Sequence, residues 1–170
     1  MDAYVKLARD TIEKYIKDRQ VYQPDPEELP RQMLTDRAGS FVSIHEQGQL
    51  RGCIGTILPV RANLAQEIIS NAIAASTRDP RFMPIESWEL PYLDINVDVL
   101  TEPERIASEA DLDVKRYGVI VEKGRRRGLL LPDLEGVDTV EEQIDIAKRK
   151  AGIDEDEEVK LQRFEVIRHK

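Results

Sequence analysis

Two β-hairpins, separated by a helical segment, constrain the fold of this chain more than any other sequence pattern. The first is predicted from strands at residues 41–44 and 50–57, joined by a turn at Gln47–Gly48. The second is predicted from strands at residues 119–123 and 129–131. Hairpins pair their strands antiparallel, and no regular alternation of strand and helix accompanies them. The sequence therefore favours an α+β fold with largely antiparallel sheet.

Periodicity predicts the remaining elements, which are helices at residues 2–19, at residues 64–76 and between Thr139 and Gly152, and strands at residues 93–99 and 159–167. Asn63 is the expected N-cap of the second helix, which has to end before Pro80. Glu142 stands at capping-box spacing from Thr139, and Gly152 is typical of a helix C-terminus. Each helix therefore lies outside the hairpins.

Size and composition indicate one compact unit. A chain of 170 residues is too short for two ordinary independent domains, and its 41% hydrophobic and 34% charged residues are typical of globular proteins. No apolar run approaches the roughly 20 residues of a membrane-spanning helix. Residues 1–6 carry neither the basic nor the apolar region of a secretory signal, so we expect a cytoplasmic protein without membrane contact.

Charge and the scarcity of cysteine and histidine restrict the chemistry. The net charge of −8 argues against non-specific binding to nucleic acid phosphates. One cysteine excludes an intramolecular disulfide, and two histidines provide no Cys/His ligand set, so we expect no resident metal or other cofactor. Asp94, Asn96 and Asp98 form a polar stripe that could hold a divalent cation, but it is more simply the solvent side of a strand.

The candidate site centres on Cys53, the only cysteine, which lies between Gly52 and Gly55 and two residues after Arg51. Glycine in a strand is tolerated where another group approaches the backbone closely, and a neighbouring guanidinium favours a thiolate over a thiol. The pattern therefore indicates a nucleophilic or redox-active cysteine. It also fits a small buried cysteine beside glycines that let the helix at residues 64–76 approach the sheet.

The hairpin register predicts which side chains share a face with the thiol. A two-residue turn pairs Ile44 with Arg51 and Val42 with Cys53. Arg51 and Cys53 then lie on one face, about 7 Å apart at the backbone, which is close enough for Arg51 to lower the pKa of the thiol. His45 points to the opposite face, so no Cys53–His45 dyad is expected. A three-residue loop would reverse the parity and restore that dyad.

Two charged loops are further candidates. In the loop Arg78–Arg81, Asp79 either orients one arginine while the other binds a substrate carboxylate or phosphate, or forms an internal ion pair that ends the helix. The sequence leaves both interpretations open. Arg125–Arg127, within the glycine-bounded connection at residues 124–128, could contact nucleic acid, but charged hairpin tips are usually only solvated, so such contact is not expected.

A last pattern is a set of strings spread over nearly the whole chain, namely Gly39–Ile44, Leu50–Thr56 (LRGCIGT), Ala74–Phe82, Tyr117–Val121, Leu129–Val137 and Lys150–Ile153. Together they resemble the AMMECR domain family, and within it the stand-alone bacterial form of the AmmeMemoRadiSam system. The resemblance implies a single domain over residues 1–170 with two lobes built on antiparallel strands, both termini in the larger lobe and a cleft between them. Residues 139–150 lack the tryptophan and cysteine common in eukaryotic members, so no role of those two residues is carried over.

The resemblance implies no established reaction, but it suggests a Memo-like protein and a radical SAM enzyme as partners. Our leading hypothesis is an enzyme or accessory that acts on, or carries, a small anionic ligand in the cleft. The candidate catalytic residues are Cys53, Arg51 and Asp79, and the candidate substrate-binding residues are Gly52, Gly55, Thr56, Arg78 and Arg81. The alternative is a non-catalytic module that docks onto the two partners, and a third hypothesis is an RNA-linked role.

Overall fold

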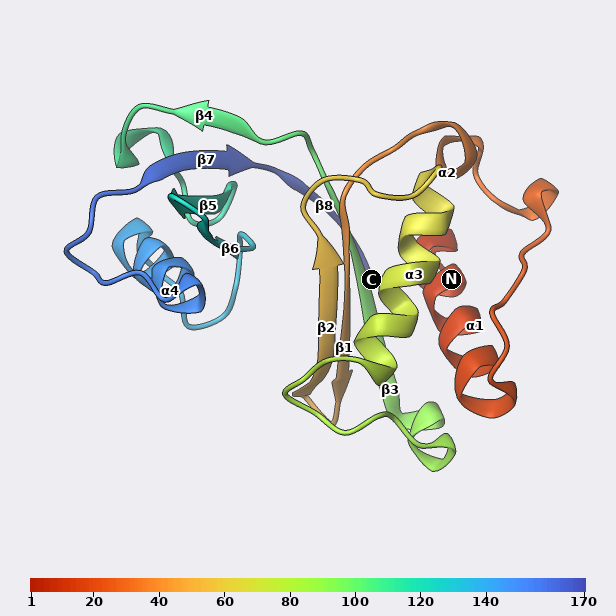
Figure 1. The fold of residues 1–170 in the computed structure, drawn as a ribbon. Coiled ribbons are helices and arrows are strands. Elements are labelled where there is room, and N and C mark those ends of the chain that lie inside the picture. Colours follow the sequence, from red (N-terminus) through yellow and green to blue (C-terminus); the bar gives the residue numbers. More distant parts are fainter. The chain divides into compact units, whose positions relative to one another are not determined.

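The first hairpin forms half of one four-stranded sheet, and the second hairpin forms half of another (Figure 1). A computed structural model describes all 170 residues and divides them into two compact units. The first unit comprises Met1–Leu100 and Ile167–Lys170, and the second comprises Thr101–Val166. The helices and the antiparallel sheets confirm the predicted α+β class. None of the helices combines the length and the hydropathy needed to span a bilayer.

The sheet of the first unit has the strand order β2-β1-β3-β8. Its strands are β1 (Ser40–Glu46), β2 (Gln49–Thr56), β3 (Leu93–Leu100) and β8 (Val166–His169). Gln47 and Gly48 both have positive φ angles, 52° and 78°, and Glu46 pairs with Gln49. Positive φ at both central residues suits the twist of the flanking strands, so the predicted two-residue turn is confirmed.

Beyond the turn, the register of this hairpin differs from the prediction. Ile44 pairs with Gly52 rather than with Arg51, because Arg51 is the extra residue of a β-bulge. Cys53 consequently pairs with Ser43, one residue later than predicted. An inserted residue changes which face the later side chains occupy, and turn length alone carries no information about it.

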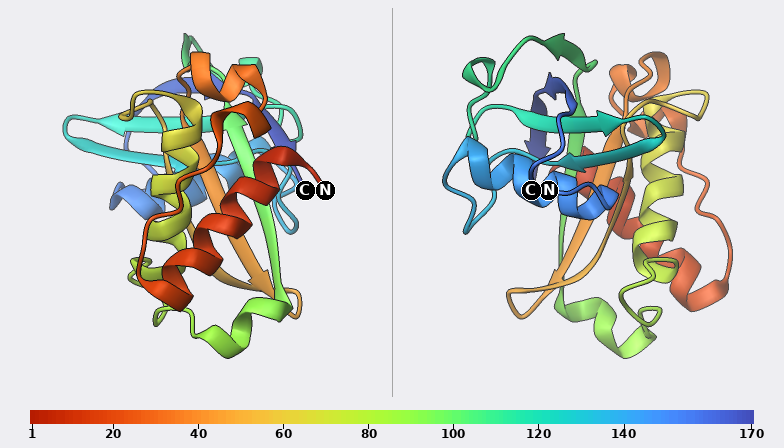
Figure 2. Two further views of the ribbon diagram at one scale, coloured as in Figure 1. Left: turned by 90° about the vertical axis from the view of Figure 1, so that its right-hand side faces the viewer. Right: turned by 60° about the vertical axis from the view of Figure 1, so that its left-hand side comes forward.

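Two long helices, α1 (Ala3–Asp18) and α3 (Leu64–Thr77), pack on one face of this sheet (Figures 1 and 2). As predicted, Asn63 caps α3, and its side chain accepts a hydrogen bond from the Gln66 N–H at 2.9 Å. Short helices that the sequence did not predict are η1 (Pro26–Glu28), α2 (Arg31–Thr35) and η2 (Ser87–Tyr92).

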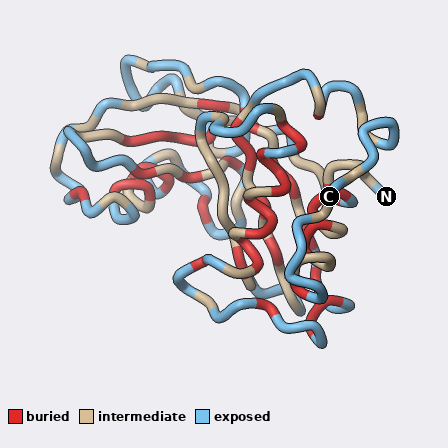
Figure 3. The backbone as a smooth tube through the Cα atoms, turned by 45° about the vertical axis from the view of Figure 1, so that its right-hand side comes forward, coloured by how far each residue is buried: buried red, intermediate tan, exposed pale blue.

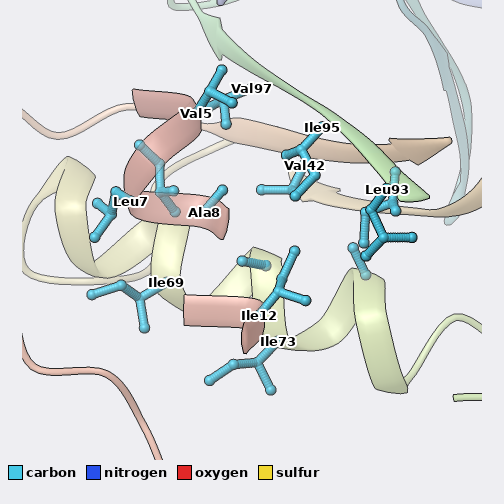
Figure 4. Close-up of a cluster of buried hydrophobic side chains, with 14 of the residues drawn as sticks. Val5, Leu7, Ala8, Ile12, Val42, Ile69, Ile73, Leu93, Ile95 and Val97 are labelled. Carbon is cyan, nitrogen blue, oxygen red and sulfur yellow. The ribbon is translucent and has the colours of Figure 1, made fainter. Parts of the chain in front are cut away.

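A single aliphatic core joins these helices to the sheet (Figure 4). The residues labelled there come from α1, α3, β1 and β3 and are Val5, Leu7, Ala8, Ile12, Val42, Ile69, Ile73, Leu93, Ile95 and Val97. Because Val42 and Ile44 point into this core, the residues between them on β1 point to the other face of the sheet. Buried residues follow the inner sides of the helices and the central strands (Figure 3). Burial of each large aliphatic side chain contributes roughly 1.5–3 kcal/mol.

The sheet of the second unit has the order β4-β7-β5-β6. Its elements are β4 (Glu104–Ile106), η3 (Glu109–Asp111), β5 (Gly118–Lys123), β6 (Arg126–Leu130), α4 (Val140–Ala151) and β7 (Lys160–Phe164). The predicted boundaries of α4 are confirmed, because Thr139 Oγ1 accepts from the Glu142 N–H at 3.1 Å and Gly152 ends the helix with φ 70°. The helix packs against β5 and β6.

Two predicted boundaries in this part of the chain are wrong. Lys123 pairs with Arg126, so the second hairpin turns at Gly124 and Arg125 alone, and the connection at residues 124–128 is shorter than predicted. The predicted strand at residues 159–167 is divided into β7 and β8, which belong to different sheets. It breaks at Glu165, whose N–H and C=O are bound by Thr101 rather than by a strand ladder.

In each unit, one glycine in the second strand of the hairpin lets the carbonyl oxygen of a helix residue approach the strand closely. A Cβ added to Gly52 would overlap the carbonyl oxygen of Ala75 in α3, and a Cβ added to Gly128 would overlap that of Ala147 in α4. No side chain fits between strand and helix at these points. The packing interpretation of Gly52 therefore accounts for this glycine.

Gly52→Ala is expected to destabilise the protein, because the added methyl group forces α3 away from β2. Overpacking of this kind costs about 1–3 kcal/mol of unfolding free energy. Gly48→Asn is the matched control in the same hairpin, since position 48 faces open space and asparagine tolerates its positive φ. Urea unfolding of both variants measures the difference, and equal midpoints for Gly52→Ala and the wild type would contradict the packing argument.

Candidate functional site

Cys53 lies on the face of the first sheet that is turned away from α1 and α3. Its neighbour Gly52 faces α3, and successive strand residues point to opposite faces. The Sγ atom of the half-buried Cys53 lies 3.3 Å from Oγ of Ser43, the residue paired with it on β1. A serine hydroxyl at this distance can donate a hydrogen bond to a thiolate. The sequence does not predict this role of Ser43, because only the bulge brings Ser43 opposite Cys53.

Asp79 and Arg81 hold the backbone of Cys53, and we call this pair the Asp79–Arg81 clamp. The Cys53 N–H donates to Oδ2 of Asp79 at 3.0 Å, and Nη2 of Arg81 donates to the Cys53 carbonyl oxygen at 3.3 Å. Arg81 also binds Asp79 in a bidentate manner, with Nε–Oδ1 3.1 Å and Nη2–Oδ2 2.8 Å. Because β2 is an edge strand, its outward backbone groups lack a strand partner, and the clamp supplies one at Cys53.

The clamp also sets the charges beside the thiol. Hydrogen bonds from Arg81 lower the pKa of Asp79 to about 2, against the opposing effect of burial and with help from the N–H groups of Cys53 and Arg81. The same contact with Asp79 raises the pKa of Arg81 against desolvation, and a negatively charged Cys53 adds to the rise. Arg81 is therefore the positively charged side chain that would interact electrostatically with a Cys53 thiolate.

Arg78 differs from Arg81 although both lie in the same loop. Arg78 is exposed and makes no ion pair or side-chain hydrogen bond within the chain. The ion pair between Asp79 and Arg81 agrees with the structural interpretation of this loop, whereas anion binding by Arg78 stays a prediction. The functional roles of these residues stay a prediction.

Arg51 lies apart from the thiol, contrary to the predicted shared face. Its Nε and Nη2 donate to the two carboxylate oxygens of Glu89 at 2.8 and 3.1 Å, and its remaining contacts are the carbonyl oxygens of Met83 and Pro84. Glu46, on the helix-covered side of β1, lies 3.9 Å from its Nε. The bulge turns this guanidinium toward the helix side, so Arg51 does not prime Cys53.

Glu46 and Glu89 lie together beside Arg51 and share a hydrogen bond, which the sequence does not predict. Burial has the largest single effect on Glu89 and raises its pKa, but the hydrogen bonds from Arg51, the Glu86 N–H and Glu46, together with the positive charge of Arg51, outweigh burial and lower the pKa. Burial and the hydrogen bond with Glu89 raise the pKa of Glu46. The two glutamates are 43 positions apart, 89 minus 46, so no local sequence signal could have paired them.

The other candidates in the LRGCIGT string have structural partners. A Cβ on Gly55 would collide with the ring of Phe41, the residue paired with it on β1. Thr56 donates from Oγ1 to the buried carboxylate of Glu67 at 2.8 Å and accepts from Asn71 Nδ2 at 3.2 Å. Glu67 in turn accepts the N–H groups at positions 60 and 61 and so anchors the loop that precedes α3.

The position of His45 relative to Cys53 differs from the prediction. It lies two residues after Ser43 on β1, so the bulge places it on the same sheet face as Cys53, contrary to the prediction. His45 nevertheless makes no hydrogen bond or ion pair. The predicted face of His45 was therefore wrong, and the absence of a Cys53–His45 dyad stays a prediction.

The two charged patches outside this region are largely engaged within the chain. At the second hairpin, Arg126 binds Glu157 at 3.0 Å and Arg127 binds Gln162 at 3.3 Å. In the predicted polar stripe, Asp98 is buried and pairs with Arg168 at 2.9 Å, so at this residue the stripe is not the solvent side of the strand. No three Cys, His, Asp or Glu side chains lie together in an arrangement suited to a metal ion.

Asp79→Asn is expected to remove a stabilising ion pair and to flatten the acid limb of the stability curve. Because the pKa of Asp79 is about 2 in the folded protein and 3.8 for an ordinary aspartate, the ionised form stabilises the fold above about pH 4. This stability, about 2 kcal/mol, is lost as the pH falls from about 4 to about 2. Urea unfolding at pH 7 and pH 2.5 measures it. A difference between the wild type and Asp79→Asn that is the same at both pH values would contradict the assignment.

The sequence and the fold both have known relatives. Residues 5–169 match the AMMECR1 family. A protein of Thermotoga maritima is 55% identical over 169 residues, which cover 98% of this chain and 97% of that protein. A protein of Clostridium acetobutylicum is 50% identical over 99% of this chain, which spans only 36% of that longer protein. The crystal structure of an uncharacterized protein from Pyrococcus horikoshii, 35% identical, covers 97% of this chain and 88% of its own with a TM-score of 0.88. The chain therefore belongs to the AMMECR1 family.

Proposed function

We propose that this protein is an enzyme, or an accessory to one, that acts on or carries a small anionic substrate at Cys53. The observation that supports the proposal is the pair of contacts at this residue: Sγ lies 3.3 Å from Ser43 Oγ, and the carbonyl oxygen holds the Arg81 guanidinium. A hydroxyl donor and a nearby positive charge both favour the thiolate. Since the thiolate is the reactive form, Cys53 serves as nucleophile or redox group.

Each neighbouring residue has a distinct role in this proposal. Ser43 donates to the thiolate, and Arg81 replaces Arg51 as the cation beside it. Asp79 is a positioning residue that fixes Arg81 and the Cys53 backbone; because it also neutralises part of the arginine charge, the expected activation of the thiol is modest. Arg78, which has no partner in the chain, binds the substrate carboxylate or phosphate.

We further propose that the protein works in the cytoplasm, in one pathway with a Memo-like protein and a radical SAM enzyme. The chain has one cysteine and therefore no internal disulfide, which agrees with a reducing compartment such as the cytoplasm. The pathway assignment rests on the family, and it implies that the anionic substrate is shared with, or delivered to, these partners.

A second candidate function is a non-catalytic binding module for the same two partners. It is supported by two ion pairs within the chain, because Arg51 is bound to Glu89 and Arg81 is bound to Asp79, so the charge of each guanidinium is already paired. In this case the thiol is a packing group, and the exposed Arg78 belongs to a recognition surface. The two functions differ in whether the sulfur atom itself is required.

Thiol reactivity tests the leading proposal. Native protein alkylated with iodoacetamide between pH 5 and 9 is expected to react at Cys53 faster than free cysteine at neutral pH, with an apparent pKa below about 8.5. Ser43→Ala and Arg81→Gln should each raise this apparent pKa and slow the reaction several-fold. Arg31→Gln, which removes an exposed arginine of α2, is the matched control. Modification of Cys53 only after unfolding would rule out the nucleophile.

Cys53→Ser separates the two functions, because it keeps the size and polarity of the side chain while removing the thiolate. The enzyme proposal predicts that a strain carrying only Cys53→Ser loses function although the protein remains folded and still binds its partners. The binding-module proposal predicts full function for Cys53→Ser and loss of partner binding for Arg78→Glu. Complementation of a deletion strain and co-purification with the Memo-like protein provide the two measurements.

A further inference from the structure

A polar hollow lies in the first unit, on the helix side of the sheet. Its volume is about 590 Å³, and its walls come from the end of α1, the bulge in β2, and residues 83–89, which include part of η2. α1 and η2 are in contact, and Figure 2 shows the end of α1 beside this segment. Volumes of 300–1,000 Å³ are typical of sites for small molecules. None of the proposed roles of Cys53 uses this hollow.

Two charges in the hollow neutralise each other. Arg51 and Glu89 form a bidentate pair whose side chains are only 18% and 7% exposed. The four hydrogen bonds of the Arg51 guanidinium use Nε, one N–H of Nη1 and both N–H groups of Nη2. The fifth N–H group therefore has no partner in the chain. It provides a fixed hydrogen-bond donor in a partly buried wall.

Two other charges in the hollow have no partner of opposite sign. Arg19 ends α1 in a left-handed conformation, φ 56°, and its guanidinium contacts only the ring of Tyr15, at 5.8 Å. Glu86 accepts a hydrogen bond from the neutral indole N–H of Trp88 at 3.0 Å but pairs with no cation. The hollow thus presents one uncompensated positive and one uncompensated negative group.

The remaining walls are apolar. Ile16 and Ile85 are buried and form part of the lining, and Met83, 80% exposed, stands at the rim. A flexible methionine adapts to apolar groups of different shapes. The hollow is therefore complementary to a ligand that carries a carboxylate, an ammonium group and an aliphatic side chain.

We propose that this hollow binds a small zwitterion with an aliphatic side chain, such as a free amino acid or the equivalent short peptide. Arg19, with the free N–H of Arg51, receives the carboxylate, because guanidinium groups bind carboxylates in a planar, bidentate manner. Glu86 receives the ammonium group. Ile16, Ile85 and Met83 cover the side chain.

Calorimetric titration of the full chain tests this proposal with defined probes. Leucine and leucylleucine are the two zwitterions, leucinamide lacks the carboxylate, and 4-methylpentanoate lacks the ammonium group. At least one zwitterion is expected to bind, and each probe lacking a charge should bind at least about tenfold more weakly. Preference for leucine identifies a free amino acid, whereas preference for leucylleucine identifies a peptide.

Substitutions localise the binding. Arg19→Asn, whose asparagine tolerates the left-handed backbone, and Glu86→Gln should each weaken binding of the preferred zwitterion at least about tenfold. Lys17→Asn, which removes a nearby positive charge outside the hollow, is the matched control and should leave binding unchanged. Absence of binding at about 10 mM of either zwitterion, equal binding of leucinamide, or unchanged binding in Arg19→Asn would overturn the proposal.

Discussion

The close approach of α3 to β2 at Gly52 is the constraint on which the rest of the first unit depends. The carbonyl oxygen of Ala75 occupies the space where any other residue would carry Cβ. Because strand residues alternate between faces, the inward position of Gly52 obliges Cys53 to point outward, toward Ser43. Gly128 and Ala147 repeat the same contact in the second unit. A hairpin against a closely packed helix is thus the structural element that both units share.

The exposed edge of β2 explains why the charged loop after α3 has two plausible interpretations. An edge strand needs partners for its outward N–H and C=O groups, and the Asp79–Arg81 clamp satisfies both groups at Cys53. The same ion pair holds the guanidinium of Arg81 against the carbonyl oxygen of Cys53, the residue that carries the sulfur atom. Stability and the proposed chemistry therefore depend on the same residues here, and removal of either partner is expected to affect both.

The bulge at Arg51 divides the LRGCIGT string between two faces of the sheet. Cys53 lies on the face away from the helices, whereas the guanidinium of Arg51 turns to Glu89 and to the hollow lined by Arg19 and Glu86. One inserted residue thus separates the proposed thiol site from the proposed zwitterion site. Both proposed sites lie within the first unit.

Local signals in the sequence determined most of the elements of this protein. The Gln47–Gly48 turn, the Asn63 cap and the Thr139–Gly152 helix all appear where the sequence predicts them, because each depends on residues only a few positions apart. The tertiary structure alone decided the bulge, the pairing of Ser43 with Cys53, and the contact of Arg51 with Glu89. These depend on how strands and loops distant in sequence pack together, and residue spacing carries no information about that packing.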